Sequence, residues 1–275
     1  MASENKKFNK DSVFGTVIVA FGVCLVCAIV VSTAAVALKP LQQTNIERDR
    51  QSNILAAAGL LEEGVSVEEQ FESVQTRVVD LRTGQFTDEV DPATYDHLRA
   101  AKSQDRSTGF DNLDTRDIAQ IGRRENYSVV YLIDDADGNL DKVILPIRGY
   151  GLWSTMQGFL ALEEDMTTVA GIGFFAHAET PGLGGEIDNP NWQQNWVGKQ
   201  LYESGELALE VIKGSVDPDA SDAEHRVDGL AGATLTTRGV DNLIQFWLGE
   251  YGFKEFLNNL KEGRAGSWLD FCPRH

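Results

Sequence analysis

A long uncharged stretch dominates the hydropathy pattern near the start of the chain. No charged residue occurs over residues 12–38, and residues 13–31 are almost wholly apolar. A helix that crosses a bilayer needs roughly 20 such residues, so this stretch is long enough to span a membrane. A cleaved signal peptide is the alternative, because Ala35-Val36-Ala37 mimics a cleavage site. The run exceeds the ~7–15 apolar residues of a signal core, which favours a retained single-pass anchor and assigns residues 1–39 to a cytoplasmic N-terminus and that anchor.

After Pro40 the pattern becomes mixed. Residues 41–61 combine polar side chains with apolar ones such as Ile46, Ile54 and Leu55, which predicts a juxtamembrane helix that ends near Gly64. Residues 65–115 are helix-like in parts and loop-like elsewhere, and their acidic side chains indicate a solvated surface. Residues 40–115 are therefore predicted to form a juxtamembrane region of helices and loops.

Strand-like segments rich in β-branched and aromatic side chains begin at residue 127. Residues 127–133 and 142–147 predict a hairpin, because residues 135–139 between them have turn composition. That turn lacks the full ligand spacing and the closing Glu of a calcium loop, which favours a plain turn. Further strands are predicted over residues 168–176 and 207–212. Short strands with interspersed helices predict an α+β domain with an antiparallel sheet over residues 116–264, followed by a tail over residues 265–275.

The last strong pattern is an amphipathic helix. Apolar positions recur at helical spacing over residues 240–248, and Thr236 or Thr237 is a suitable N-cap. Exposed N–H groups and the helix dipole favour a phosphate at such a terminus. An ordinary tight turn into a helix explains the same spacing, because Thr and Gly are common at helix starts. Spacing alone leaves both interpretations open.

Composition and charge narrow the classes of partner. The chain has 275 residues, 42% of them hydrophobic, and its 24 basic and 42 acidic residues give a formal charge of −18. Such a surface repels polyanions, which argues against nucleic acid as a partner. Lysines in the first ten residues balance Lys39, Arg48 and Arg50 beyond the anchor, so charge counting gives only a slight preference for a cytoplasmic N-terminus.

The cysteines form no disulfide framework. Cys24 and Cys27 share one face of the predicted spanning helix, and packing as small apolar side chains is favoured over a metal or cluster role, because two thiols cannot complete a four-ligand site. Cys272 has no other cysteine near it in the sequence. We find no metal-ligand set, and no GxGxxG or Walker loop where a nucleotide fold would need one.

Candidate chemistry is concentrated in residues 228–240, Asp-Gly-Leu-Ala-Gly-Ala-Thr-Leu-Thr-Thr-Arg-Gly-Val. The pattern Asp-Gly-x-x-Gly-Ala-Thr-x-Thr resembles the flavinylation motif of the C subunits of sodium-translocating NADH:quinone reductases. In that family the last Thr carries FMN through a phosphoester bond, which implies Thr236 as the acceptor here. The family often has Ser in place of Ala231, so one hydroxyl near the phosphate is missing. The resemblance also implies FMN contacts from the neighbours of the acceptor: Gly232, Ala233, Thr234, Leu235 and Thr237.

Two more segments resemble the same family, and the likeness extends from the anchor to about residue 264. Residues 179–184, Glu-Thr-Pro-Gly-Leu-Gly, suit a flat aromatic ligand, because Pro181 stiffens the turn, the glycines clear space and Leu183 offers an apolar surface. A Pro-Gly turn is the structural alternative for this loop taken alone. Residues 149–155 are the third match. Together these segments imply further FMN contacts: Glu179, Thr180, Gly182, Leu183, Gly184, Trp153 and Ser154.

Four side chains have competing interpretations. Trp153 either stacks on the flavin or caps the core. His177 tunes a flavin or, as is commoner for a lone histidine, is satisfied at a strand end. Asp228 helps phosphate transfer or bonds nearby backbone. If Glu179 lies beside the ring, its charge opposes flavin reduction, so a Gln there is expected to raise the reduction potential.

The family resemblance implies an electron-relay subunit of a respiratory complex in the bacterial inner membrane, with its FMN domain on the periplasmic side. It implies other subunits that bind NADH and carry sodium, since the anchor has no carboxylate inside the membrane run. It also implies a separate FAD-dependent flavin transferase, because a threonine hydroxyl is not acidic enough to react unaided. No residue is predicted to be catalytic. The alternatives are the equivalent flavin subunit of the ion-motive ferredoxin–NAD complex, and a non-redox tethered scaffold whose Thr-rich turn is only structural.

Overall fold

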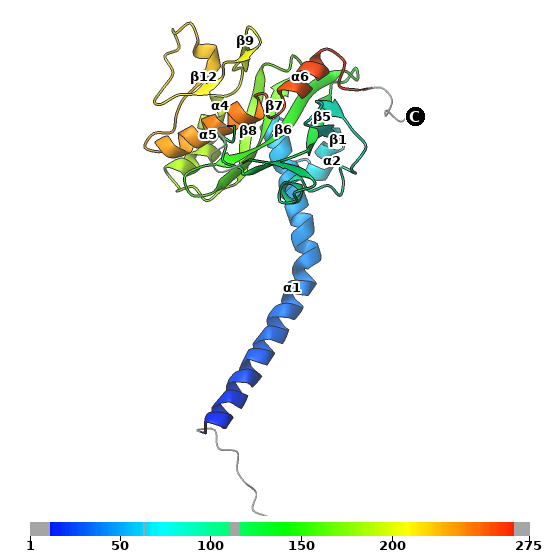
Figure 1. The fold of residues 1–275 in the computed structure, drawn as a ribbon, viewed down its shortest axis with the longest axis vertical. Helices are drawn as coiled ribbons and strands as arrows, with labels where there is room; N and C mark the ends of the chain where they lie inside the picture. The colour runs from blue at the N-terminus through cyan, green and yellow to red at the C-terminus, as the bar shows by residue number, and fades with distance from the viewer. Residues whose placement is uncertain (1–11, 63, 111–115, 267–275) are drawn as a thin grey trace, which may run out of the picture. The chain divides into compact units, whose positions relative to one another are not determined.

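The structure is a computed structural model that describes residues 12–62, 64–110 and 116–266 (Figure 1). The chain divides after Asp49 into two compact units, and each is described on its own. Cys272 and most of the predicted tail lie outside the described residues.

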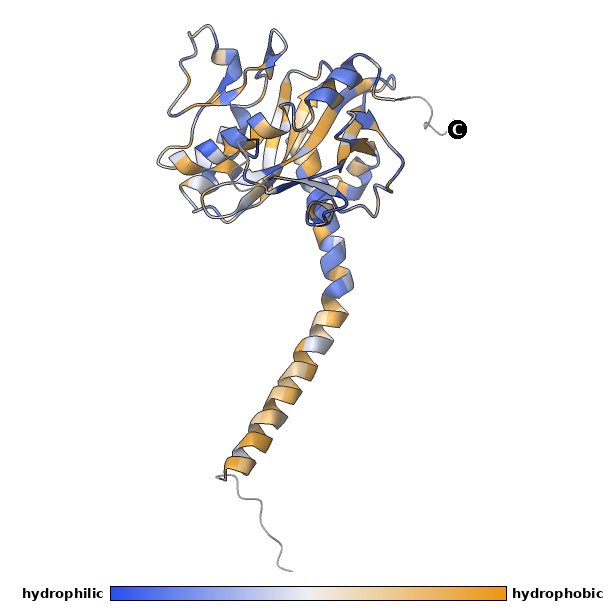
Figure 2. Cartoon of the chain, in the orientation of Figure 1, coloured by the Kyte–Doolittle hydropathy of each residue, from blue (hydrophilic) through white to orange (hydrophobic). Residues whose placement is uncertain are grey.

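The first unit consists of most of one long helix, α1 (Val13–Ala57). Figure 2 shows that its apolar part is continuous from the start and gives way to polar residues toward its C-terminal end. Among the described residues it is the one helix long and apolar enough to cross a membrane. Cys24 and Cys27 are exposed on this helix.

The helix predicted over residues 41–61 is confirmed over residues 41–57. Its predicted separation from the anchor is wrong, because α1 continues through Pro40 without interruption. Its predicted end near Gly64 is also wrong. Leu60 N donates to Leu55 O and Gly59 N donates to Ala56 O, and Gly59 has φ +70°. This pair of bonds around a left-handed residue is a Schellman cap, which terminates the helix several residues before Gly64.

The second unit is built on one six-stranded antiparallel sheet of order β2-β1-β5-β6-β7-β8. The predicted hairpin over residues 127–147 and the predicted strand over residues 168–176 are confirmed as β5, β6 and β8. The α+β class with an antiparallel sheet is likewise confirmed. The strand bounds are β1 Val74–Asp80, β2 Gln85–Phe86, β5 Tyr127–Asp134, β6 Leu140–Tyr150, β7 Thr155–Glu163 and β8 Val169–Ala176.

Both faces of this sheet are buried. Val130 and Leu132 pack in a cluster that includes Leu243 and Ile244 of α5 (Thr234–Trp247). The alternate residues of the same strand pack in a second cluster that includes Ile54, from the end of α1. A strand buried on both faces is a nearly continuous apolar run, which explains why residues 127–133 are so easily recognised in the sequence.

The remaining elements are short and surround the sheet. The predicted strand over residues 207–212 is wrong as a single element, because the strand is interrupted at Ala208 and Leu209, whose N–H groups both donate to Leu201 O. The turn before β6 is a plain one: Asp135 Oδ1 accepts from the backbone N–H groups of Asp137 and Asn139. No cluster of three potential metal ligands occurs in the described residues. The other bounds are α2 Val67–Phe71, α3 His97–Ala101, β3 Ser107–Gly109, β4 Arg123–Glu125, η1 Gly184–Asp188, α4 Pro190–Gln194, β9 Tyr202–Glu203, β10 Glu206–Leu207, β11 Glu210–Val211, η2 Ala223–His225, β12 Arg226–Val227 and α6 Lys254–Lys261.

Candidate functional site

The three segments singled out in the sequence meet at one carboxylate, that of Glu179. Its Oε1 accepts the backbone N–H of Leu152 at 3.0 Å and that of Trp153 at 2.9 Å. Its Oε2 accepts the hydroxyl of Thr236 at 2.6 Å. The loop after β8, the connection between β6 and β7, and the first turn of α5 are therefore joined by the two oxygens of one side chain.

The position of α5 follows from close packing against β6. A Cβ at Gly239 would lie 2.6 Å from Tyr150 O, so only glycine permits this approach. Near the other end of the helix, Trp247 Nε1 donates to Arg148 O at 2.6 Å. These contacts hold the start of α5 beside the β6–β7 connection, which carries Trp153.

The N-cap prediction is wrong in detail. The helix begins at Thr234 with Ala233 at the N-cap position and no side-chain capping bond, so Thr236 and Thr237 lie within the first turn. Thr237 Oγ1 instead accepts the backbone N–H of Leu230 at 3.0 Å. The chain enters the helix through Gly232, whose φ of +75° favours glycine. Of the two threonines, only Thr236 therefore directs its hydroxyl toward Glu179.

Thr236 is closed off from solvent, with 1% of its surface exposed. A Cβ at Gly184 would lie 2.4 Å from Thr236 Oγ1 and 2.9 Å from Glu179 Oε2. The missing side chain at Gly184 thus makes room for this hydrogen-bonded pair, rather than for an open ligand space as the sequence suggested. Gly182 has open space around it, and its φ of +74° serves the turn.

Large apolar side chains are exposed on the segments that surround the threonine. Trp153 is 63% exposed, Leu183 is 45% exposed and Leu235 is 51% exposed. The alternative that Trp153 caps the core is therefore wrong. Leu183 lies close to Gly232, since a Cβ there would be 3.2 Å from Leu183 Cδ2. Single exposed apolar residues are common, but several around one buried hydroxyl indicate a surface for a planar ligand.

His177 supports Glu179 rather than any ligand of its own. Its Nδ1 accepts the backbone N–H of Glu179 at 3.1 Å, and its Nε2 lies 2.7 Å from Asp188 Oδ2. Both ring nitrogens are thus engaged, which agrees with the interpretation of a satisfied histidine. Ser154 also holds the chain next to Glu179, because its Oγ accepts the backbone N–H of Ala178 at 2.7 Å.

Asp228 and Thr180 also bond to local backbone. Asp228 Oδ1 accepts the N–H of Val216 at 2.7 Å, which favours the local interpretation of this aspartate over a part in phosphate transfer. Thr180 is exposed, and its carbonyl accepts the N–H groups of Leu183 at 3.1 Å and Gly185 at 2.9 Å. Thr234 is exposed in the first turn of α5. These residues shape the loop and the helix start around the pair.

The sequence did not reveal the contact between Glu179 and Thr236. The two residues are 57 positions apart, and the motif suggested only that both lie near a ligand. The contribution of Leu152 was also missed, because it acts through its backbone N–H and leaves no mark in residue type.

The ionisation of Glu179 follows from this environment. Burial raises the pKa of the Glu179 carboxyl, but the hydrogen bonds from Thr236, Trp153 and Leu152 outweigh burial and hold its pKa below the usual value. A carboxyl whose pKa is lowered on folding stabilises the protein above its unfolded pKa. That contribution is lost as the pH falls through the lowered folded value.

We expect the flavin-free protein to lose stability as the pH falls through this window, and a Glu179→Gln variant to lose less. The difference in unfolding free energy between the two proteins should be largest near neutral pH and shrink on acidification. Urea unfolding followed by circular dichroism over a pH series measures it. A difference that does not change with pH would contradict this account of Glu179.

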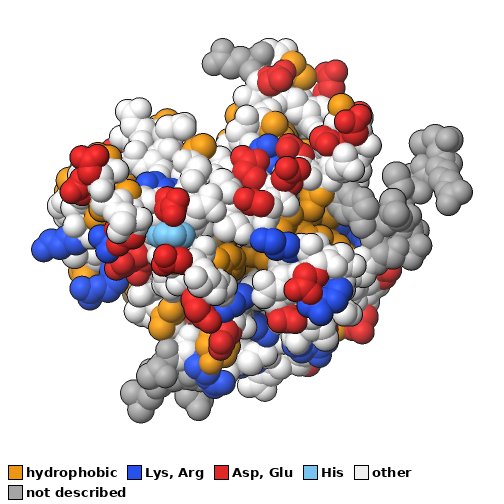
Figure 3. Space-filling model, turned by 90° about the horizontal axis from the view of Figure 1, so that it is seen from above, with side chains coloured by type: hydrophobic (Ala, Val, Ile, Leu, Met, Phe, Trp, Pro, Cys, Tyr) orange, Lys and Arg blue, Asp and Glu red, His pale blue; other side chains and the backbone are white. Residues whose placement is uncertain are grey.

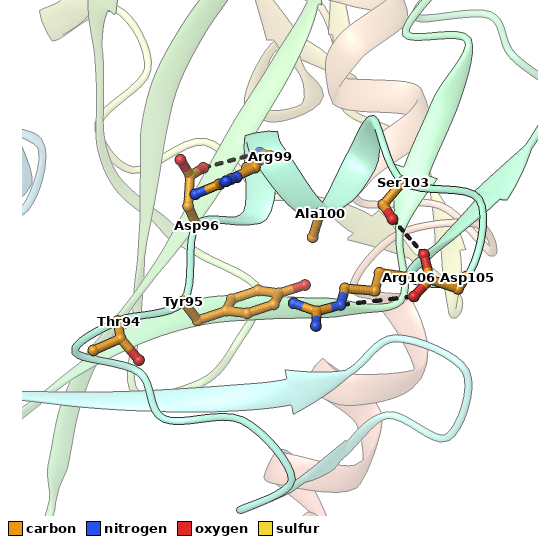
Figure 4. A pocket seen from close by; sticks show the side chains of 8 residues that line it. All are labelled: Thr94, Tyr95, Asp96, Arg99, Ala100, Ser103, Asp105 and Arg106. Atoms are coloured by element: carbon orange, nitrogen blue, oxygen red, sulfur yellow. Dashed lines mark hydrogen bonds and ion pairs between the residues drawn. The ribbon is translucent and has the colours of Figure 1, made fainter.

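A hollow lies away from these segments, between the start of α3 and the turn that follows it (Figure 4). Three of its charged side chains, those of Asp96, Asp105 and Arg106, have partners within the hollow. Asp96 Oδ1 accepts the N–H of Arg99 at 3.0 Å, and Asp105 accepts a hydrogen bond from Ser103 and lies 3.9 Å from Arg106. Tyr95 donates to Tyr127 O at 2.9 Å. Nothing in this arrangement points to a particular ligand.

The surface charge agrees with the composition. Figure 3 shows acidic side chains spread over the face seen from above, with basic ones among them and no uniform basic area on that face. A polyanion therefore finds no continuous positive surface there.

Comparison with known proteins gives a matching domain family and several close relatives of this chain. The family described as FMN-binding domain matches residues 151–249, which include all three segments around Glu179 from Gly151 onward. The C subunit of the Na(+)-translocating NADH-quinone reductase of Pseudomonas aeruginosa is 55% identical over 94% of this chain and 99% of its own length. The C subunit of the same reductase from Vibrio alginolyticus is 47% identical over 93% of this chain and 98% of its own.

Solved structures agree with the sequence comparison. The crystal structure of Shewanella oneidensis NqrC matches with a TM-score of 0.72 and 34% identity, over 79% of this chain and 99% of its own. The crystal structure of the C subunit of the Na(+)-translocating NADH-quinone reductase from Parabacteroides distasonis matches with a TM-score of 0.62 and 27% identity, over 80% of this chain and 96% of its own. Sequence and fold therefore point to the same relatives.

Proposed function

Because this chain belongs to the family of Na(+)-translocating NADH-quinone reductase C subunits, we propose that it holds FMN through a phosphoester to Thr236 and relays electrons within that complex. The observation that supports this most directly is the hydroxyl of Thr236. It lies in the first turn of α5 and within the FMN-binding domain match, hydrogen-bonded to Glu179 and bordered by exposed apolar side chains.

The residues around Thr236 suit both the phosphate and the ring of FMN. A hydroxyl in the first turn of a helix 14 residues long is placed where the helix dipole favours a phosphate. Trp153, Leu183 and Leu235 offer exposed apolar area for the ring. Gly232, Ala233 and Thr234 form the entry to the helix beside the attachment point, and Thr237 braces it through Leu230.

Bound FMN would supply the redox chemistry, and the protein would position and tune it. Thr236 acts as an attachment point and takes no part in turnover. The loop over residues 179–184 and the Trp153 segment orient the ring and exclude water from one side. A phosphoester link keeps the flavin on the protein while leaving the ring free to exchange electrons.

Attachment requires part of this loop to move, because Thr236 is 1% exposed in the structure. Gly184 lies directly against it, since a Cβ there would be 2.4 Å from Thr236 Oγ1. We propose a separate flavin transferase that uses FAD and engages the chain with this turn displaced. The hydroxyl needs such an enzyme, because threonine is a weak nucleophile until a base activates it.

Other subunits complete the activity. The chain belongs to a family of subunits of the reductase, and NADH is proposed to bind elsewhere in the complex because no dinucleotide-binding loop occurs in the sequence. The anchor carries no charged residue over residues 12–38, so sodium is proposed to cross through other subunits.

The membrane anchor α1 supports an inner-membrane location, and we propose that the FMN domain faces the periplasm. Protease added to intact spheroplasts tests this orientation. It should cleave the FMN domain without lysis, whereas protection until lysis would place the domain in the cytoplasm.

The main proposal is tested by mass spectrometry of the peptide that spans Val227 to Arg238. Protein produced with a flavin transferase should carry the mass of one FMN, less one water, on Thr236. A band that fluoresces under ultraviolet light on a denaturing gel gives the same answer quickly. An unmodified Thr236 after production with an active transferase would refute the covalent link and favour the scaffold alternative.

The alternative expected from the sequence, the equivalent flavin subunit of the ion-motive ferredoxin–NAD complex, shares the threonine motif and the anchor. The relatives above favour the quinone reductase. Sodium-dependent quinone reduction by the complex that co-purifies with this chain distinguishes the two.

A further expectation concerns the flavin potential. Replacing Glu179 with Gln removes a negative charge near the proposed ring surface. This should raise the flavin's reduction potential by on the order of tens of millivolts, as expected when a partly screened unit charge is removed. Redox titration of the fraction that acquires flavin measures this shift. Glu186→Gln removes a charge from η1, directly after the loop that contains Glu179, and its smaller effect serves as the control. An unchanged or lowered potential in the Glu179 variant would rule out its proximity to the ring.

A further inference from the structure

Thr236 and Glu179 form a buried hydrogen bond in which the threonine is the donor and the carboxylate is the acceptor. Thr236 Oγ1 donates its single hydroxyl proton to Glu179 Oε2 at 2.6 Å, and the two residues are only 1% and 4% exposed. A hydroxyl has one proton and two lone pairs. With the proton committed to the carboxylate, the lone pairs of Thr236 Oγ1 are directed elsewhere and are available for bond formation.

The carboxylate of Glu179 is held in place by groups other than the threonine. Its Oε1 accepts two backbone N–H groups, those of Leu152 and Trp153, at 3.0 and 2.9 Å. Its own backbone N–H donates to His177 Nδ1 at 3.1 Å, and His177 is held in turn by Asp188. The acceptor oxygen that faces Thr236 is therefore preorganised, which is how enzymes orient a base toward a nucleophile.

Resting on the proposed attachment at Thr236, we infer that Glu179 is the general base for flavin transfer, which orients the acceptor hydroxyl and takes up its proton. In this step Thr236 Oγ1 forms a bond to the phosphorus of the FMN half of FAD. The bond from that phosphorus to the oxygen it shares with AMP breaks, and AMP leaves with the electron pair. The proton passes from Oγ1 to Glu179 Oε2 and then to solvent.

The turn beside the hydroxyl is closed by hydrogen bonds that do not include the Glu179 carboxylate. Gly184 lies against Thr236, since a Cβ there would be 2.4 Å from Thr236 Oγ1. The turn around it closes on Thr180 O through the N–H groups of Leu183 and Gly185. The hydrogen bonds that hold Glu179 run instead to Leu152, Trp153 and His177. The turn can therefore be displaced by the transferase while the carboxylate keeps its hold on the hydroxyl.

Glu179→Gln tests this role with little change of shape. The amide oxygen of Gln can still accept the N–H groups of Leu152 and Trp153. Its NH₂ group then faces Thr236 and offers a donor where the hydroxyl needs an acceptor. Glu186→Gln is the matched control, because Glu186 lies in η1 directly after the loop and its Oε2 accepts from Asn189 Nδ2 at 2.7 Å. The measurement is the rate of covalent flavin attachment to the full-length chain by purified transferase with FAD, followed by in-gel fluorescence and mass.

We expect the maximal rate for Glu179→Gln to fall by at least about tenfold, as for loss of a general base, with the KM for the acceptor chain within about twofold of wild type. A merely structural role would raise KM or lower the melting temperature and leave the maximal rate unchanged. A maximal rate that falls less than about tenfold overturns the inference. Wild-type chain that gains no flavin would instead overturn the proposed attachment itself, so the two failures are distinct.

Gly184→Ala gives a second test that keeps both partners. The new Cβ would lie 2.4 Å from Thr236 Oγ1 and 2.9 Å from Glu179 Oε2, so the pair must separate although both groups remain. The backbone at Gly184 needs no left-handed conformation, which permits alanine there. The maximal rate should again fall by at least about tenfold, as for an uncoupled base. A rate near that of wild type in a folded Gly184→Ala protein would contradict the need for this contact.

Discussion

Replacing Thr236 with Ala is expected to abolish covalent flavin completely. The variant lacks the only oxygen on which we propose the phosphoester forms, and no rearrangement of the site replaces it. The nearest candidate, Thr237, is 5% exposed and its hydroxyl already accepts the backbone N–H of Leu230 at 3.0 Å. The denatured band should show no flavin fluorescence, and the peptide that spans Val227 to Arg238 should keep its unmodified mass. Electron transfer through the complex should be lost as a consequence.

Two matched variants separate the hydroxyl from the threonine side chain as a whole. Thr236→Ser keeps an oxygen beside Glu179 and should retain flavin at a reduced rate. Thr108→Ala removes an exposed threonine from β3, outside the three segments around Glu179, and should load as wild type does. Flavin that stays bound to Thr236→Ala after unfolding would show that another residue carries the link.

The fold of Thr236→Ala should survive, which makes the loss of flavin interpretable. The variant removes one hydrogen bond to a charged group, which typically contributes about 1.5–3 kcal/mol, and Glu179 keeps its two backbone donors. A folded domain tolerates a loss of that size when its total stability is about 5–15 kcal/mol. Circular dichroism of the purified variant should therefore match that of the flavin-free wild type.

Local patterns in the sequence predicted the strongly patterned parts of the fold. The hairpin of β5 and β6 has apolar strands and an Asp-Gly turn, so composition alone identifies it. β1 was missed, because Val74–Asp80 includes Gln75, Thr76 and Arg77 and has no turn signal that pairs it with β2. Its partner β5 is about 50 residues away, and such a pairing leaves little local trace.

Helix ends were harder to predict for a physical reason. Proline usually interrupts a helix because it lacks an N–H and clashes with the preceding turn, yet α1 passes through Pro40. The end was decided instead by a local capping pattern at Gly59, whose left-handed backbone allows the two closing bonds. Either glycine, at 59 or at 64, is a plausible stop from sequence, and only the backbone geometry distinguishes them.

The sequence predicted which segments form the site, but not how their side chains contact one another. Residues 149–155, 179–184 and 228–240 were each identified, and they do come together. What the residue types could not reveal is that Glu179 contacts the acceptor threonine directly and that Gly184 covers it. Both facts depend on how the β8 loop packs on α5, which is a tertiary property.

The last turns of α1 are expected to be part of the folded domain, although the rest of the helix is an anchor. Ile54 is 0% exposed and Leu55 is 1% exposed, and both pack in the cluster that includes Val78 and Ile144 of the sheet. Gly171 makes the approach close, since a Cβ there would lie 2.3 Å from Ala57 O. A chain that begins at Arg50 keeps these contacts, whereas one that begins at Gly59 loses them.

The chain from Arg50 should therefore be soluble and folded, and the chain from Gly59 should be severely destabilised. Burying a Leu or Ile side chain contributes about 1.5–3 kcal/mol, so losing Ile54 and Leu55 together removes roughly 3–6 kcal/mol and uncovers one face of the sheet. That is a large share of a stability of about 5–15 kcal/mol. Urea unfolding of the two chains measures the difference.

Within the chain from Arg50, Ile54→Ala should lower the unfolding free energy by about 2–5 kcal/mol, whereas Leu61→Ala, at a site 44% exposed, should lower it much less. Equal stability of the two truncated chains would mean that the sheet does not depend on the end of α1, and the helix would then act as a tether alone.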